Sequence, residues 1–200
     1  MFKSLRVGIG IGALGALLGG LAHPAAAESQ VERGKYLVTI TGCGDCHTPG
    51  SFLGHPDLTK FLGGSDVGFA IPGLGVFVGR NLTPDPETGL GKWTNLQIVT
   101  AFTTGVRPDG RILAPIMPYE DFKHMTKSDA QAVAAYLKSL PPVKHAVPGP
   151  FGPSETPTTF VMAVMPGNVY ASMPKPPGPP PGAGGPPGAG GPPAGGAPQH

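Results

Sequence analysis

The chain has 200 residues, of which 33 are Gly and 27 are Pro, a share that on composition alone suggests low complexity or disorder. Its formal charge is +2 and it contains no cluster of Lys or Arg, so we exclude a protein that binds nucleic acid through a basic patch. The excess of Gly and Pro is concentrated near the C-terminus, where residues 174–200 hold 11 Pro and 9 Gly. The remaining chain is long enough for one domain with a modest core.

The first 27 residues have the pattern of a secretory signal peptide. Lys3 and Arg6 precede an apolar stretch at residues 7–22, and three alanines at 25–27 form a small-residue cleavage site. The apolar stretch falls short of the roughly 20 residues that span a bilayer, which favours a cleaved leader over an uncleaved anchor. We expect cleavage after Ala27 and a soluble periplasmic protein. Removing the leader leaves 12 basic and 12 acidic side chains.

Three segments carry the apolar spacing and the end signals of helices. Residues 31–41 form the first, in which Gly34 allows another backbone to approach closely. The second begins with the capping box Thr94-Asn95-Leu96-Gln97 and ends at Gly105. The third begins with a capping box at Ser128-Asp129-Ala130-Gln131 and stops at two consecutive prolines. The rest of the domain is predicted to be rich in loops.

The two cysteines of the chain lie in the run Cys43-Gly44-Asp45-Cys46-His47. This C-x-x-C-H spacing is typical of the covalent attachment of a c-type haem. Each thiol adds to one vinyl group of the porphyrin, and the adjacent His47 reaches the iron as the proximal ligand. One such run predicts one covalent haem c. An attached apolar macrocycle also supplies core that three short helices lack.

Three other interpretations of the motif compete with haem attachment. A structural disulfide or a thioredoxin-like redox pair fits the spacing, but the thioredoxin-like site follows a strand, whereas the preceding residues predict a helix. A zinc site needs further ligands, and the chain offers no other cysteine and only scattered histidines, His55, His124 and His145. We therefore favour haem.

The second axial ligand comes from another part of the chain, and we favour Met117. It lies in Ala114-Pro115-Ile116-Met117-Pro118-Tyr119, where prolines on both sides stiffen an extended loop able to hold a thioether against the iron. Most methionines next to apolar residues only fill a core, and that interpretation stays open. The other candidates are a histidine, Met125, Met162, Met165 and Met173.

Four side chains in the middle of the chain are candidates to neutralise or hydrogen-bond the two propionates of a haem. They are Arg80, Trp93, Arg107 and Arg111, with Arg80 and Trp93 taken as the cofactor-binding pair. Each arginine can equally be a solvated surface group, and Trp93 can be simple core.

Composition divides the chain into a signal peptide at 1–27, a haem domain at 28–146, an extension at 147–173 and a tail at 174–200. The extension has enough apolar side chains to wrap across the domain. The tail has none larger than Ala or Pro, so it is predicted to be disordered and semi-rigid. It lacks a sustained Gly-X-Y repeat, which excludes collagen. Contact of the tail with a partner or the cell envelope is the alternative.

Several separated motifs together resemble the class I c-type cytochromes. They lie at residues 33–37, 43–47, 115–118 and 135–138. Three further stretches resemble the individual haem domains of cytochrome subunits that serve periplasmic alcohol and aldehyde dehydrogenases. These stretches are residues 79–85, 88–94 and 105–111.

The resemblance implies an all-α fold around one haem, with the first and last helices crossing close to Gly34. It also implies His47 and Met117 as axial ligands and electron transfer, not catalysis, as the function. A dehydrogenase is the expected donor and an oxidase or another cytochrome the acceptor, with the chain either a free carrier or a subunit of the complex. The alternative is a haem protein with an open sixth position, acting as a sensor or a peroxidase-like enzyme.

Overall fold

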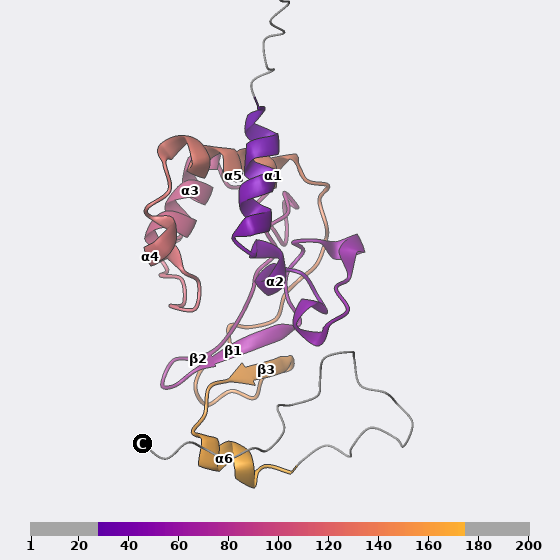
Figure 1. The fold of residues 1–200 in the computed structure, drawn as a ribbon, viewed down its shortest axis with the longest axis vertical. Helices are drawn as coiled ribbons and strands as arrows, with labels where there is room; N and C mark the ends of the chain where they lie inside the picture. Colours follow the sequence, from indigo (N-terminus) through magenta and orange to yellow (C-terminus); the bar gives the residue numbers. More distant parts are fainter. Residues whose placement is uncertain (1–27, 175–200) are drawn as a thin grey trace, which may run out of the picture.

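The main helices gather at one end of the molecule and a small sheet lies at the other, with the short helix that carries both cysteines between them (Figure 1). The computed structural model describes residues 28–174. The helices are α1 (Gln30–Ile40), α2 (Cys43–His47), α3 (Asn95–Thr104), α4 (Tyr119–Phe122), α5 (Lys127–Ser139) and α6 (Gly167–Ser172). The strands are β1 (Val67–Ile71), β2 (Gly75–Val78) and β3 (Phe160–Ala163), and two 3-10 turns cover Ser51–Leu53 and Leu58–Lys60.

Helices α1 and α5 cross with their backbones in contact at Gly34, which confirms the predicted crossing. A Cβ atom at this position would lie 1.9 Å from the carbonyl oxygen of Ala132, so only glycine fits. Around the crossing, α1, α3 and α5 pack their apolar faces together with two leucines from loops. The buried members of this cluster are Leu37, Val38, Leu62, Leu90, Ile98, Ala132, Val133, Ala134 and Leu137.

Two helices begin and end close to where the sequence predicts. Helix α1 starts one residue before the predicted segment, after a capping box between Ser29 and Glu32. The capping box between Thr94 and Gln97 is confirmed, and α3 ends at Gly105 as predicted, with φ at 76°. Local hydrogen bonding of these polar side chains therefore determines both helix starts.

The predicted start of the last helix is wrong. Its cap is Thr126, whose hydroxyl accepts a hydrogen bond from the backbone N–H of Asp129, and α5 runs from Lys127. Thr126 has the extended backbone that a capping residue adopts, with φ −62° and ψ 154°, whereas Ser128 already lies inside the helix. Thr126 and Ser128 can each cap a helix, and it is Thr126, the earlier of the two, that caps α5.

The all-α prediction holds only in part, because the structure contains a three-stranded sheet of order β2-β1-β3. Strands β1 and β2 form an antiparallel hairpin in which Phe69 pairs with Phe77, and β3 lies parallel to β1 with Met162 beside Phe69. Valine and phenylalanine on both sides of a Pro-Gly turn favour this hairpin. The fold is a helical domain with a small sheet.

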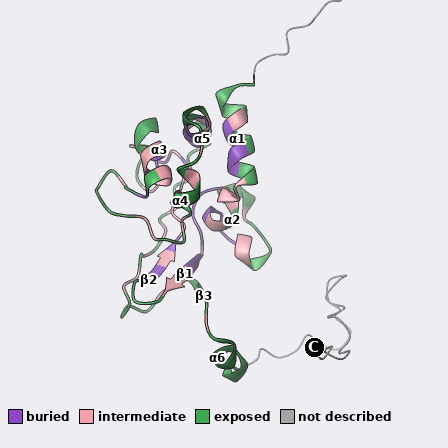
Figure 2. Cartoon of the chain, turned by 60° about the vertical axis from the view of Figure 1, so that its left-hand side comes forward, coloured by how far each residue is buried: buried purple, intermediate pink, exposed green. Residues whose placement is uncertain are grey.

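The chain that follows α5 returns to the sheet end of the molecule. The backbone of Val143 is held by side chains from the loop after β2, Phe151 forms an isolated antiparallel bridge with Val76, and β3 then pairs with β1. Strand β3 and helix α6 are exposed throughout, whereas the facing sides of α1 and α5 are buried (Figure 2). Within residues 28–174 no helix combines the length and the apolar character that crossing a bilayer requires.

Two predictions concern chain that lies outside the described residues. These are the signal peptide at 1–27 and, apart from its first residue, the Pro/Gly-rich tail at 174–200 with its proposed contacts.

Candidate cofactor site

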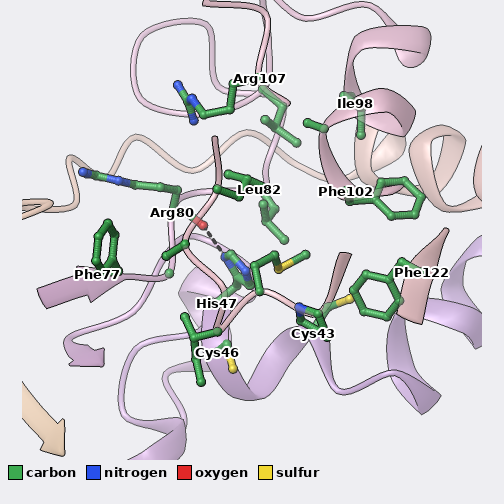
Figure 3. Close-up of a pocket in the computed structure, with 18 of the residues that line it drawn as sticks. Cys43, Cys46, His47, Phe77, Arg80, Leu82, Ile98, Phe102, Arg107 and Phe122 are labelled. Atoms are coloured by element: carbon green, nitrogen blue, oxygen red, sulfur yellow. Dashed lines mark hydrogen bonds between the residues drawn. The ribbon is translucent and has the colours of Figure 1, made fainter. Parts of the chain in front are cut away.

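The C-x-x-C-H motif forms helix α2, and the side chains of Cys43, Cys46 and His47 line one cavity of about 330 Å³ (Figure 3). Helices α3, α4 and α5, strand β2 and the loops between them supply the other walls, which are mainly apolar. The apolar lining includes Leu82, Leu90, Ile98, Phe102, Phe122, Val133 and Leu137. A cavity of this size and character suits a ligand that is largely apolar.

Both cysteines carry free thiols at the wall of this cavity. The Sγ atom of Cys43 lies 3.4 Å from the Oγ1 atom of Thr41. Burial raises the pKa of the Cys43 thiol and of the Cys46 thiol, and the nearby carboxylate of Asp45 acts in the same direction. The structure thus presents two neutral thiols to the cavity, both within the motif that attaches a haem.

The imidazole of His47 is buried and fixed by one hydrogen bond. Its Nδ1 atom lies 2.6 Å from the carbonyl oxygen of Arg80, and because a carbonyl can only accept, Nδ1 donates. Burial lowers the pKa of His47 and keeps the ring neutral. The Nε2 atom therefore retains the lone pair that a metal ligand needs.

The backbone of Gly79, just before Arg80, packs directly against the C-x-x-C-H motif. A Cβ atom at Gly79 would lie 1.8 Å from the carbonyl oxygen of Cys46 and 3.3 Å from Nδ1 of His47. The absence of a side chain at Gly79 brings the Arg80 carbonyl within hydrogen-bonding distance of the imidazole.

Two of the candidate methionines, Met117 and Met125, lie in the wall of the cavity. Met117 projects from a turn in which its N–H donates to the carbonyl of Ala114 at 2.9 Å. Met125 also packs against the buried helical cluster. Met162 and Met173 are exposed, at 42% and 47%, and neither lines the cavity.

The scattered histidines stay apart from the cysteines. The Nδ1 atom of His145 donates to the carbonyl oxygen of Gly63 at 2.8 Å, and His145 lines a different depression between the loops and the C-terminal chain. His55 and His124 are absent from the residues that line the cavity. The zinc interpretation therefore gains no ligand from the described part of the chain.

Three arginines, Arg80, Arg107 and Arg111, line the cavity together with Trp93. The guanidinium of Arg107 lies 5.1 Å from the centre of the Trp93 ring and 3.3 Å from the carboxylate of Asp109. Burial lowers the pKa of Arg80, and the positive charges of Arg111 and Arg107 lower it further. This side of the cavity is thus electropositive, as an anionic group would require.

The side chain of Arg80 is also engaged by the chain beyond α5. Its guanidinium donates to the backbone carbonyls of Val147 and Gly149, and Pro150 lines the cavity next to them. Sequence patterns predict that residues 147–173 wrap the domain, but they do not place residues 147–150 at the cavity. No local pattern marks these four, because their partner lies more than sixty positions away.

These residues fit a haem. Two neutral thiols stand beside one neutral imidazole, methionine sulfur is available in the same cavity, the walls are apolar and the cations lie at one side. A covalently attached, mostly apolar ring with two carboxylates matches that donor set.

Comparison with known proteins agrees with this geometry. A family model described as cytochrome c matches residues 31–141. The chain is 36% identical, over 68% of its length, to the cytochrome c subunit of an alcohol dehydrogenase (quinone) from Gluconacetobacter polyoxogenes. It is 33% identical over 66% of its length to the cytochrome c subunit of gluconate 2-dehydrogenase from Pantoea cypripedii, and 28% identical over 69% to the cytochrome subunit of fructose dehydrogenase from Gluconobacter japonicus.

The match covers only part of each relative. It spans 28% of the alcohol dehydrogenase subunit, 30% of the gluconate 2-dehydrogenase subunit and 28% of the fructose dehydrogenase subunit. The family match, in contrast, covers more than half of this chain and contains the whole C-x-x-C-H motif together with Met117. The chain therefore belongs to the cytochrome c family, whose domain implies covalently bound haem c.

Proposed function

We propose that this chain is a monohaem c-type cytochrome of the periplasm that carries single electrons from a dehydrogenase to a terminal oxidase or another cytochrome. The observation that carries the proposal is the cavity lined by two free thiols, a neutral imidazole and Met117. Relatives named as cytochrome subunits of alcohol, gluconate and fructose dehydrogenases support a dehydrogenase as donor. One C-x-x-C-H motif in the chain supports one haem.

In this proposal Cys43 and Cys46 hold the haem covalently, and His47 and Met117 are the axial ligands of its iron. When bound, the haem supplies a metal that takes up and releases one electron. The Arg80 carbonyl keeps His47 in the tautomer that binds iron through Nε2. Methionine ligation and apolar walls both raise the reduction potential, the walls because they disfavour the more highly charged ferric state.

The propionates would lie on the electropositive side of the cavity. Arg80 and Trp93 are the pair that the sequence favours, and the structure gives them different surroundings. Trp93 stacks with the guanidinium of Arg107 and so helps to hold that cation. The guanidinium of Arg80 already donates to two carbonyls and that of Arg107 to the carboxylate of Asp109, so Arg111 is the cation of this group best disposed to bind a carboxylate of the haem.

Substitution of Met117 tests the ligand assignment. In Met117→Ala the ferric spectrum should lose its methionine signature and the reduction potential should fall, because the iron loses its thioether ligand. Met125→Ala is the matched control, since Met125 lines the same cavity, and it should keep both properties.

Two outcomes would contradict the proposal. An unchanged spectrum in Met117→Ala, with the signature lost in Met125→Ala, would move the ligand to Met125. A wild-type ferrous haem with five ligands would instead favour the sensor or peroxidase-like alternative. Sequencing of the mature N-terminus tests export separately, and a start at Glu28 is expected.

A further inference from the structure

The chain that follows α5 forms part of the cavity wall. We define the C-terminal strap as residues 143–163, which lie beyond the end of the family match at 141. Within the strap, Pro150 lines the cavity, and the carbonyls on either side of Pro148 accept hydrogen bonds from the guanidinium of Arg80. The cytochrome domain alone therefore does not enclose the cavity.

The strap is fastened to the sheet end at several further points. The Nδ2 atom of Asn81 donates to the carbonyl of Val143 at 2.7 Å. Phe151 and Val76 exchange two backbone hydrogen bonds, each of 2.9 Å, and the N–H of Phe160 donates to the carbonyl of Asp66 at 3.1 Å. Among the described residues that line the cavity, Arg80 is the one whose side chain donates hydrogen bonds to the strap.

Arg80 stands at the junction of the strap and the iron ligand. Its carbonyl holds His47, while its guanidinium holds the backbone of Val147 and Gly149. The side chain is partly buried among like charges, since Arg107 and Arg111 line the same side of the cavity. Two carbonyl acceptors offset that repulsion and fix the guanidinium toward the strap.

We propose that Arg80 is a positioning residue that holds the C-terminal strap across the edge of the cavity, so that the strap limits the access of water to the haem and sustains its reduction potential. This inference rests on the proposed function for the haem itself. It assigns Arg80 a role through the strap, distinct from direct contact with a propionate.

Arg80→Lys in the full-length protein carrying its haem tests the inference. Lysine keeps the charge, but one ammonium group cannot reproduce the two-pronged donation of a guanidinium to separate carbonyls. Amide hydrogen exchange at Phe151 and Phe160 should become about tenfold faster, as expected for the loss of one hydrogen bond from a charged donor. The reduction potential should fall, because water then reaches the haem. Arg107→Lys is the matched control and should leave exchange in the strap unchanged.

A second variant loosens the strap without altering Arg80. Gly149 has φ at +78°, a conformation that alanine adopts poorly, so Gly149→Ala should displace the accepting carbonyl and give the same two changes. Wild-type exchange in both variants would overturn the inference, and faster exchange with an unchanged potential would refute the shielding role. A wild-type protein without covalent haem would instead refute the proposed function, while the exchange comparison would still show whether Arg80 holds the strap.

Discussion

The two ends of this molecule are stabilised in different ways. At the helical end, apolar side chains from α1, α3 and α5 pack together, one ion pair between Arg33 and Asp129 joins α1 to α5, and each of these helices is capped by a side chain three positions from its hydrogen-bond partner. At the sheet end, polar side chains join segments about sixty positions apart, as Asn81 does with Val143. The cavity lies between them and takes residues from both.

This difference separates the chemistry of the site from its surroundings. Cys43, Cys46 and His47 follow directly from α1, and Met117 precedes α5, so the groups that we propose to attach the haem and to ligate its iron belong to the helical end. Arg80 and Pro150 belong to the sheet end and its strap. We infer that the helical end determines which cofactor is bound, whereas the sheet end tunes the environment of that cofactor.

The largest expected loss of stability comes from adding a methyl group to a glycine that lies against another backbone, Gly34 at the helical end or Gly79 at the sheet end. Gly34→Ala places a Cβ atom 1.9 Å from the carbonyl oxygen of Ala132, and Gly79→Ala places one 1.8 Å from that of Cys46. Each backbone must move, so each variant should lose about 3 kcal/mol or more of stability in denaturant titration.

The two variants should differ in the haem site, which tests whether the ends have separate roles. Gly79→Ala should also disturb the His47 spectrum, because Gly79 positions the Arg80 carbonyl that holds the imidazole. Gly34→Ala should leave the spectrum of the folded fraction unchanged. Gly167→Ala is the control, since a Cβ atom there meets nothing within 4 Å. Equal spectral change in both variants would show that the two ends are not separable.

The sequence predicts the structure of the helical end better than that of the sheet end. The caps at Thr94 and Gly105 are local patterns, and the structure places them as predicted. The error at Ser128 is also local, because Thr126 competes for the same role. The helix boundaries are thus predictable because their signals lie within a few residues of what they determine, whereas the ion pair between Arg33 and Asp129 joins positions 96 residues apart.

The sheet end escapes prediction for a physical reason. Strand β3 is recognisable only through its pairing with β1, roughly ninety positions earlier, and its exposed residues carry no periodic burial pattern. The contact of Arg80 with Val147 and Gly149 involves backbone carbonyls, which every residue possesses. The sequence therefore identifies Arg80 as a cofactor-binding candidate but does not identify its partners in the strap.

An intermediate loss of stability is expected from removing the side chain of Asn81, which lies buried at the sheet end. Asn81 is only 2% exposed, and it donates to Val143 and Thr88 while its Oδ1 atom accepts from Thr83. Asn81→Ala should therefore lose about 2 to 3 kcal/mol in denaturant titration, because buried partners are left without hydrogen bonds.

The location of that loss matters more than its size. Hydrogen exchange should increase in the strap and in the loop after β2, but not in α1 or α5. The exposed Asn95, at the start of α3, gives the control variant Asn95→Ala, which should stay close to wild type. Uniform acceleration across both ends would mean that they unfold as one unit.

The smallest effect is expected at Asp85, whose contribution to stability is present near neutral pH and disappears in acid. Its carboxylate accepts hydrogen bonds from the hydroxyl and the N–H of Thr88, both at 2.7 Å, and from the N–H of Glu87 at 3.1 Å. The Thr88 hydroxyl, followed by its N–H, holds the pKa of Asp85 below its usual value. The carboxylate therefore stabilises the fold above its ordinary pKa of about 3.9, and this contribution is lost as pH falls through the lower pKa of the folded state.

Asp85→Asn removes this titration while keeping an oxygen of the same shape to accept the three hydrogen bonds. Near pH 7 the variant should be slightly less stable than wild type, and the difference should shrink as pH falls below about 4. Thr88 also accepts the N–H of His145 at 3.0 Å, so acid should loosen the strap before it affects α1 and α5. Thermal unfolding from pH 7 to pH 2, combined with exchange in the strap, measures both effects. If the stability difference between Asp85→Asn and wild type stayed constant across this range, Asp85 would act through its shape and not through its charge. Acid would then not loosen the strap through this residue.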